Sequence, residues 1–333
     1  MLGIVVLNWN GKADTLGALA SLRAADLPPS TQTLVADNGS ADGSVAAIRA
    51  AFPKVRILEN GANLGFAEGN NRGWRALAEA GADTLFFLNN DAVVAPDAVT
   101  RLCRALDADP DLGAVSPRIY SGDGARSGTA GVWYEKGMTT PDRLSVAAHV
   151  SATVGERCLP RYPTECVCGC ALLIRTELMA RLRGFDPSLF AYYEDADLSL
   201  RLRHDLNLAL AVVPGAAVWH KGSRSTGGAL SPVSSFYLTR NARRVARERG
   251  TANEWRVFDR EYGRAVGARA RFFARGGSAF GAESGGAALL GGWCALRNQT
   301  GIMPAVNRAP WTRLAALLAR LPGGQRAPGE GTS

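Results

Sequence analysis

Short apolar runs alternate with helical patterns through the first third of the chain. The apolar runs cover residues 3–8, 33–38, 55–60 and 83–91, and the helical patterns cover residues 12–25, 40–52, 65–81 and 96–109. Short apolar runs bounded by turn residues are typical of buried strands, and an apolar face that repeats every three to four residues is typical of helices. The repeated strand–helix order predicts an α/β fold with a mostly parallel, Rossmann-like sheet and helices on both of its faces.

Each of the four predicted strands ends in polar residues. These ends and the loops that follow them contribute Asn8, Asn10, Asp37, Asn38, Glu59, Asn60, Asn63, Asn89, Asn90 and Asp91. In an open parallel sheet, ligands bind beyond the carboxyl ends of the strands. The sequence therefore predicts a ligand site at this edge.

The later part of the chain is less regular. Residues 114–165 show few strong periods, and after them the patterns predict strands at 170–174 and 209–220 and helices at 176–183 and 192–204. We expect one domain over residues 1–230, with a nucleotide-binding half at about 1–113 and an acceptor half at about 114–230. A basic amphipathic helical segment at 231–275 and a Gly/Ala-rich extension at 276–333, ending in a partly disordered tail, follow it.

The composition suits a protein with a sizeable core. The chain has 333 residues, of which 47% are hydrophobic and 20% charged, and none of its apolar runs is long enough to span a membrane. The opening MLGIVVLNWNGK lacks a basic leader and is interpreted as a strand, not a signal peptide. A cytoplasmic location is expected.

Positive charge is concentrated near the C-terminus. Residues 240–275 hold eleven arginines and four acidic residues, out of a net charge of +8 for the whole chain. Such a segment is either a solvated helical face or a surface for an anionic partner. Trp255, Phe258 and Tyr262 follow a helical spacing there, which fits core packing or peripheral contact of residues 236–275 with the inner face of a membrane. Nucleic acid is not expected as a partner, because no known binding motif is present.

Three cysteines, Cys166, Cys168 and Cys170, alternate with other residues. Structural zinc sites use differently spaced pairs, so the pattern favours core packing on one face of a strand.

The common nucleotide-binding motifs and the nucleophile elbow are missing from the sequence. Phosphate would then be held through a divalent metal that bridges carboxylate and phosphate oxygens. Asp91 stands where such a ligand is needed, although a turn cap explains it equally well. His220 ends a predicted strand and would complement a single carboxylate, although lone histidines are more often structural.

Glu194 and Asp195 begin a predicted helix. Helical geometry places Asp195 on the apolar side, where a carboxylate suits general base catalysis, and predicts a surface ion pair between Asp197 and Arg201. The alternative is that both acids only complement the helix dipole.

Seven motifs occur in order over residues 3–244: VVLNWNG, VADNGSADGS, ENGANLGFAEGNNRG, FFLNNDAVV, CGCALLIRTELMARLRGFDPSLFAYYEDADLSLRLR, VWHKGSRST and FYLTRNARR. Together they resemble inverting family 2 glycosyltransferases of the GT-A fold, in the rhamnosyltransferase-like branch. The resemblance implies transfer of a sugar from a nucleoside-diphosphate sugar, such as dTDP-rhamnose, to a hydroxyl of a glycan, polyprenyl-linked or small-molecule acceptor. It also implies Mg²⁺ or Mn²⁺ as cofactor and a place in polysaccharide or cell-wall synthesis.

The resemblance also implies roles for single residues. Asp91 would bind the metal with His220 as a second ligand, Asp195 would be the base beside Glu194, and Arg240 would lie near the donor phosphates or the membrane. The remaining donor-site residues are Asn8, Asn10, Asp37, Asn38, Asn63, Gly65, Asn70, Asn89 and Asn90. Asp37 would contact the nucleobase of the donor. Asn63 and the glycine-containing turn after it would line the nucleotide and its diphosphate.

Asn89 and Asn90 depart from the family pattern, because many relatives carry a second acid there. A non-catalytic binding or scaffold protein with a decayed metal site is therefore the alternative. A sugar-nucleotide pyrophosphorylase is excluded, because NWNGK lacks the Gly- and Lys/Arg-rich loop that such enzymes need after the first strand. An oligomer is compatible with the sequence.

Overall fold

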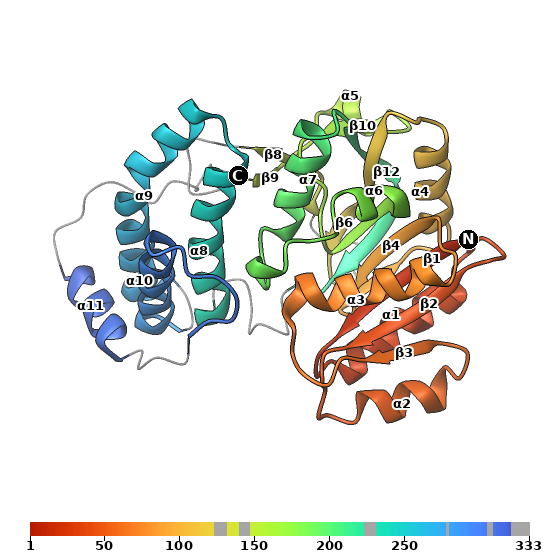
Figure 1. Cartoon of the computed structure of the whole chain (residues 1–333), viewed down its shortest axis with the longest axis horizontal. Helices are drawn as coiled ribbons and strands as arrows, with labels where there is room; N and C mark the ends of the chain where they lie inside the picture. Colours follow the sequence, from red (N-terminus) through yellow and green to blue (C-terminus); the bar gives the residue numbers. More distant parts are fainter. Residues whose placement is uncertain (123–131, 140–146, 223–230, 278–279, 305–308, 321–333) are drawn as a thin grey trace. The chain divides into compact units, whose positions relative to one another are not determined.

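The computed structural model describes residues 1–122, 132–139, 147–222, 231–277, 280–304 and 309–320. The chain divides into two units (Figure 1). The α/β unit comprises Met1–Met138, Ala147–Pro187 and Glu194–Ser225, and the helical unit comprises Thr139–Val146, Ser188–Tyr193 and Thr226–Ser333. The helical unit thus takes in a short segment, Ser188–Tyr193, that interrupts the α/β unit in sequence.

The first half of the α/β unit alternates strands and helices. Its elements are β1 (Leu2–Asn8), α1 (Lys12–Ala24), β2 (Gln32–Asp37), α2 (Ser44–Ala51), β3 (Arg56–Glu59), α3 (Gly65–Glu79), β4 (Thr84–Asn89), β5 (Ala92–Val94) and α4 (Ala98–Asp107). The four strands and four helices predicted in this half are confirmed within a few residues.

The second half of the unit contains more strands. Its elements are β6 (Leu112–Ser121), β7 (Val132–Tyr134), β8 (Lys136–Thr139), β9 (Ala147–Val150), α5 (Val154–Arg157), β10 (Tyr162–Thr164), β11 (Ala171–Arg175), α6 (Thr176–Arg181), the 3-10 turn Pro187–Leu189, α7 (Glu194–His204) and β12 (Ala209–His220). The long strand β6 has no counterpart in the predictions, because its sequence LGAVSPRIYS mixes Gly, Ser and Pro with the apolar residues.

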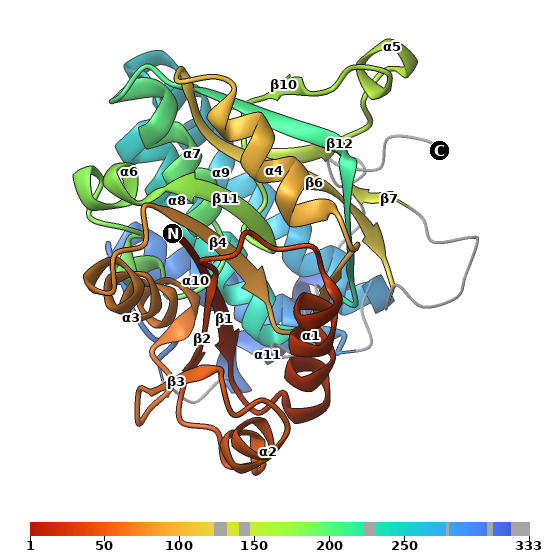
Figure 2. The same ribbon diagram turned by 90° about the vertical axis from the view of Figure 1, so that its right-hand side faces the viewer.

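The main sheet has the order β10-β12-β6-β11-β4-β1-β2-β3, with β5 beside β12 and β7 beside β6 (Figure 2). β1 pairs in parallel with both β2 and β4, and β2 pairs in parallel with β3. β11 is antiparallel to both β4 and β6 and joins the two halves of the sheet. The parallel strands β1 to β4 therefore place their polar ends at one edge, as the sequence predicts.

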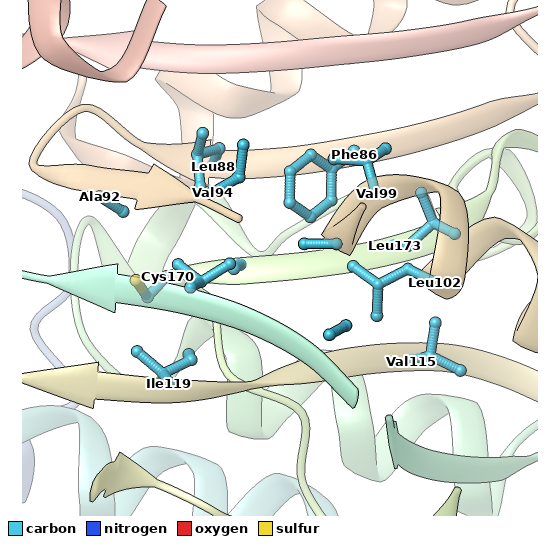
Figure 3. Packing of buried hydrophobic residues seen from close by; sticks show 14 of the residues in the cluster. Phe86, Leu88, Ala92, Val94, Val99, Leu102, Val115, Ile119, Cys170 and Leu173 are labelled. Atoms are coloured by element: carbon cyan, nitrogen blue, oxygen red, sulfur yellow. The ribbon is translucent and has the colours of Figure 1, made fainter. Parts of the chain in front are cut away.

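Alternate residues of a strand point to opposite faces of the sheet. Apolar residues occupy both sets of positions here, and helices cover both faces. Ile4 and Phe86 belong to a core with α1, α2 and α4. Figure 3 shows part of this core, in which Leu173 of β11 lies opposite Phe86 of β4. Val5 and Phe87 belong to a second core with α3, α6 and α7. Both cores fix the sheet and, with it, the strand ends.

Two glycines let α3 lie close to the sheet. A Cβ on Gly73 would come within 2.6 Å of Val5, and a Cβ on Gly69 within 2.5 Å of Leu7 and 2.9 Å of Asn38. These are shorter than real Cβ contacts, so any larger residue would push the helix away.

Three cysteines directly before β11 are buried, and two of them, Cys168 and Cys170, belong to the first core. Cys166, Cys168 and Cys170 are buried and free of disulfides, and burial raises the pKa of each thiol. Core packing of these cysteines is confirmed, although they lie in an irregular segment before β11 and not in a regular strand.

The helical unit contains α8 (Pro232–Arg249), α9 (Ala252–Phe272), the π-helical turn Phe273–Gly277, α10 (Ala282–Leu296) and α11 (Ala309–Ala319). Phe236 and Tyr237 pack with Leu290 and Cys294 in its core. α10 and α11 lie within the Gly/Ala-rich extension predicted at 276–333. The expected disordered tail at the end of that extension cannot be compared over residues 321–333, which lie outside the described residues.

The aromatic stripe of α9 is largely buried. Phe258 and Tyr262 are 3% and 2% exposed, and the Tyr262 hydroxyl donates to the Thr239 carbonyl. Trp255 lies with its ring 4.9 Å from the Arg243 guanidinium. Core packing therefore explains Phe258 and Tyr262. Among the described residues, no helix has both the length and the apolar character needed to cross a bilayer.

Candidate functional site

The turn after β4 brings Asp91 and His220 together. Asn90 and Asp91 form this turn, and β5 then runs antiparallel to β12 with Ala92 opposite His220. The Lys221 N–H donates to the Asp91 carbonyl at 3.1 Å, which fixes the two chains beside the turn. The antiparallel pairing of β5 with β12 thus brings together two residues that are far apart in sequence.

Both side chains are buried, and their polar atoms lie close together. His220 Nε2 lies 3.0 Å from Asp91 Oδ1. The orientation of the imidazole toward Asp91 Oδ1 does not allow a hydrogen bond between the two side chains. Neither ring nitrogen of His220 has a hydrogen-bond partner among the described residues. Buried polar atoms are rarely left unpaired, so this pair fits the binding of a ligand between or beside them.

The separation suits two ligands of one metal ion. Neighbouring ligand atoms on an octahedral ion stand about 3 Å apart, because each metal–oxygen bond is about 2.0–2.1 Å long. The mixture of imidazole and carboxylate suits a transition ion such as Mn²⁺ better than Mg²⁺. Within the described residues, no group of three or more His, Cys, Asp or Glu side chains could hold a metal, so the other ligands would be phosphate oxygens and water.

Two further side chains adjoin His220. The Trp133 ring packs edge-on at 4.7 Å between centroids, which restricts the rotation of the imidazole. Lys221 Nζ lies 2.6 Å from Asp14 Oδ1 of α1. Lys221 directly follows the strand-end histidine in sequence, and its ion pair with Asp14 links the end of β12 to α1.

Asn8 organises the ends of β1 and β2. Its Nδ2 donates to Asp37 Oδ1 at 2.7 Å and to Ser40 Oγ at 3.0 Å. Asp37 also accepts hydrogen bonds from the backbone N–H and the hydroxyl of Ser40. Asp37 is thus held rigidly at the strand edge, and Ser40 is a polar partner that sequence reasoning did not single out.

Asn90 belongs to the same network. Its Nδ2 lies 3.2 Å from Thr15 Oγ1 and 3.4 Å from Asn8 Oδ1, and Thr15 Oγ1 donates to Asn8 Oδ1 at 2.7 Å. A Cβ on Gly11 would come within 2.1 Å of the Asn90 amide. Asn90 therefore supports the loop after β1 and sets the position of Asp91 beside it.

The loop before α3 is closed by three amides. Asn38 Nδ2 donates to the Gly65 carbonyl at 2.9 Å, and the Gly65 N–H donates to Asn63 Oδ1 at 2.9 Å. Asn60 Nδ2 donates to Asn38 Oδ1. Gly65 has φ +78°, a conformation that favours glycine. The predicted residues Asn38, Asn63 and Gly65 are thus neighbours.

The other predicted amides differ in accessibility. Asn10 is exposed in the loop after β1 and has φ +51°. Asn89 ends β4, and its N–H donates to the Cys170 carbonyl at 2.9 Å. Asn70 is buried within α3. Its side-chain amide donates a hydrogen bond to the Phe66 carbonyl one turn earlier in the same helix.

Asp195 is linked to the same edge through the Cys168–Cys170 turn. Its Oδ2 accepts the Gly169 N–H at 2.9 Å, and its Oδ1 accepts the Ala196 N–H at 2.8 Å. The next residue, Cys170, accepts the Asn89 N–H. One turn thus holds both the end of β4 and the half-buried carboxylate of Asp195.

Glu194 is the more deeply buried acid of the pair. Its Oε2 is buried without a hydrogen-bond partner among the described residues. Burial, followed by the neighbouring charge of Asp195, raises the pKa of Glu194 well above its usual range. The deep burial expected for Asp195 is thus found at Glu194, while Asp195 is half-buried.

The prediction of a surface ion pair on α7 is wrong. Asp197 and Arg201 do pair at 2.8 Å, but their side chains are only 1% and 7% exposed. Arg201 also donates to the carbonyls of Leu182 and Gly184. The helix is packed on most of its sides, so its sequence period could not identify a surface face.

Arg240 is buried in the helical unit. Its guanidinium donates to the carbonyls of Ser188, Leu189 and Gly301. The next residue, Asn241, donates to the carbonyls of Leu189, Ala191 and Tyr192. These contacts favour a role in holding the 188–192 segment over the predicted contact with donor phosphates.

Sequence comparison identifies the family. The model of glycosyl transferase family 2 matches residues 3–179. The N-acetylglucosaminyl-diphospho-decaprenol L-rhamnosyltransferase of Mycobacterium tuberculosis is 32% identical over 248 residues, which cover 68% of this chain and 78% of the relative. The uncharacterized glycosyltransferase YfnE of Bacillus subtilis is 32% identical over 126 residues, which cover 35% of this chain and 31% of that protein.

Solved structures with the same fold are also similar. The mannosyltransferase PcManGT from Pyrobaculum calidifontis, in complex with GDP-Man and Mn²⁺, has a TM-score of 0.51 and 17% identity, covering 96% of this chain and 80% of that chain. S. aureus TarS 1–349 in complex with UDP has a TM-score of 0.51 and 12% identity, covering 90% and 92%. These neighbours have the GT-A fold, as predicted. The chain therefore belongs to glycosyl transferase family 2 and is a rhamnosyltransferase-like member with the GT-A fold.

Proposed function

We propose that the chain transfers a rhamnosyl group from a nucleoside-diphosphate rhamnose to a hydroxyl of a polyprenyl-linked glycan, with inversion at the anomeric carbon. The name of the mycobacterial relative supports both the sugar and the lipid-linked acceptor. The observation that carries the proposal is the buried Asp91–His220 pair at the sheet edge, 3.0 Å apart, in which neither imidazole nitrogen has a hydrogen-bond partner among the described residues.

Asp91 and His220 would hold a divalent ion, for which Mn²⁺ and Mg²⁺ are the candidates. When bound, the ion supplies positive charge to the diphosphate as it leaves. The Asn8–Asp37–Ser40 network gives the nucleotide a rigid polar edge, which lowers the entropy lost on binding.

Asp195 acts as the general base in this proposal. The acceptor oxygen bonds to the anomeric carbon, the bond from that carbon to the diphosphate oxygen breaks, and the hydroxyl proton passes to the Asp195 carboxylate. The N–H groups of Gly169 and Ala196 hold that carboxylate in one orientation. A positioned base contributes about 10²- to 10⁴-fold to the rate.

The test is transfer by the full chain from a panel of nucleotide sugars, with Mn²⁺, to a polyprenyl-diphosphate-linked acceptor. We expect turnover with dTDP-rhamnose and a loss of about 10²- to 10⁴-fold for Asp195→Asn, with donor affinity retained. Asp205→Asn, which changes an exposed acid after α7, is the matched control and should keep full turnover.

The alternative is a binding or scaffold protein with a decayed site. It predicts donor binding at most, with no nucleotide release for any sugar in the panel. Wild-type turnover by Asp195→Asn would instead keep the enzyme but remove the base assignment.

A further inference from the structure

Large apolar side chains are exposed on the last two helices of the helical unit. On α10, Trp293 and Leu296 are 41% and 61% exposed, and on α11, Leu314 and Leu317 are 41% and 56% exposed. Exposed apolar residues that occur singly are ordinary, but groups of them mark binding surfaces. We call these four side chains and Trp311 the α10–α11 face.

The face is continuous across the two helices. Trp293 and Leu296 are three residues apart and so share one side of α10, as Leu314 and Leu317 do on α11. The rings of Trp293 and Trp311 lie 5.9 Å apart between centroids and join the two sides.

The inner side of α11 docks on α10 through small residues. A Cβ on Gly286 would lie 2.7 Å from the Thr312 nitrogen, and a Cβ on Gly285 would lie 3.0 Å from the Ala315 Cβ. Ala315 is fully buried in this contact. The leucines of α11 are therefore left exposed by a helix that is already packed.

Positive charge accompanies the apolar side chains. The Arg297 guanidinium lies 4.9 Å from the Trp293 ring, Arg313 is exposed on α11, and Arg320 is exposed directly after that helix. No acidic residue occurs in the sequence between Glu283 and Glu330. No ion pair involves these three arginines within the part of the chain that the structure describes.

This combination suits a lipid surface better than a second copy of the chain. Tryptophan and leucine insert at the boundary of headgroups and acyl chains, while arginines reach the phosphates on flexible stems. A symmetric dimer through this face would bring the same arginines against each other without acidic partners, which is unfavourable.

We infer that the α10–α11 face docks the enzyme on an anionic bilayer. The inference rests on the proposed function for its purpose, because a polyprenyl-linked acceptor is held in a membrane. It also shifts the apolar part of the expected membrane contact from residues 236–275 to residues 293–317, because the aromatic stripe of α9 is largely buried.

Co-sedimentation of the full chain with vesicles, without donor or acceptor, tests the inference. The vesicles are phosphatidylcholine alone or phosphatidylcholine mixed with phosphatidylglycerol. We expect binding to the mixed vesicles, weakened by about ten-fold or more in Leu296→Ser/Leu317→Ser, which removes half-exposed leucines. Arg297→Gln/Arg313→Gln should lose about five-fold per arginine on the mixed vesicles, since each basic residue near such a surface adds about 1 kcal/mol.

Val154→Ser/Leu159→Ser is the matched control, because these side chains are 75% and 48% exposed on the α/β unit. Binding of this control should equal that of the wild type. Equal binding by all variants would overturn the inference, and so would a dimer in light scattering that only the leucine variant dissociates. Vesicle binding by a chain that fails every transfer assay would remove the proposed function and leave the docking intact.

Discussion

Asp91 Oδ1 lies 3.0 Å from His220 Nε2. The pairing of β5 with β12, which sets Ala92 opposite His220, produces this contact. Each residue alone is a common strand-end feature, and together they offer two ligand atoms at the spacing of neighbouring positions on an octahedral ion.

Asp91→Asn and His220→Ala should each weaken Mn²⁺ binding by more than about 10- to 100-fold, since loss of an outer-shell partner alone costs that much. Titration of Mn²⁺ by electron paramagnetic resonance, in the presence of the nucleoside diphosphate, measures the affinity without turnover. His204→Ala, at the exposed end of α7, is the control and should bind as the wild type does. Unchanged affinity in His220→Ala would make the histidine structural.

The polar ends of the strands could be predicted from the sequence, but the burial of the two faces of α7 could not. The polar ends of β1 to β4 follow from alternation in sequence, and parallel pairing brings Asp37 and Asp91 to one edge without further information. The surroundings of Glu194 and Asp197 depend on what packs around α7. Because both faces of that helix are covered, its polar residues face neighbours that no sequence period reveals.

The helices α10 and α11 were not predicted from the sequence, for a related reason. Gly and Ala dominate α10. Because these residues are neither strongly apolar nor polar, the sequence of α10 shows no clear alternation of apolar and polar positions with the period of a helix. The same small residues permit the close packing of Gly285 and Gly286 against α11. A composition typical of flexible segments here serves helix packing.

The buried Glu194 should make stability depend on pH. Its pKa is raised in the folded protein, so between its ordinary value of about 4.3 and the raised value the folded state binds more protons than the unfolded state. The free energy of unfolding should therefore fall as pH rises, by up to about 1.4 kcal/mol per pH unit relative to Glu194→Gln.

Urea unfolding of both proteins between about pH 5 and about pH 8 measures this difference. Glu194→Gln keeps the shape of the side chain and removes the titrating proton. Parallel pH profiles for the two proteins would show that Glu194 ionises normally in the fold.

Two helical glycines should respond oppositely to alanine. Gly73→Ala should lower the free energy of unfolding by about 1–3 kcal/mol, the usual cost of overpacking, because its Cβ would meet Val5 at 2.6 Å. Gly17→Ala on α1 should raise it by about 0.5–1 kcal/mol, because nothing lies within 4 Å of that Cβ. Chemical denaturation measures both, and a loss of stability in Gly17→Ala would contradict the prediction.

Asn241 should be needed as a hydrogen-bond donor in the helical unit. Its Nδ2 donates to three carbonyls, those of Leu189, Ala191 and Tyr192, in a segment where Phe190, Tyr192 and Tyr193 have φ between +66° and +71°. Such conformations cost about 1–3 kcal/mol each and persist only when their surroundings hold them. Asn241→Asp removes the donor and sets a carboxylate against the carbonyls, so it should destabilise the fold by more than Asn241→Ala does, each by at least about 1–3 kcal/mol.

Asn298→Asp is the matched control, because the Asn298 amide acts there as an acceptor. Its Oδ1 accepts from Arg247 Nη1 at 2.6 Å, and a carboxylate keeps that bond. The thermal midpoint of Asn298→Asp should stay at or above that of the wild type, while both Asn241 variants unfold at lower temperature. A wild-type midpoint for Asn241→Asp, together with a lower midpoint for Asn241→Ala, would show that loss of volume, and not loss of the donor, weakens the segment.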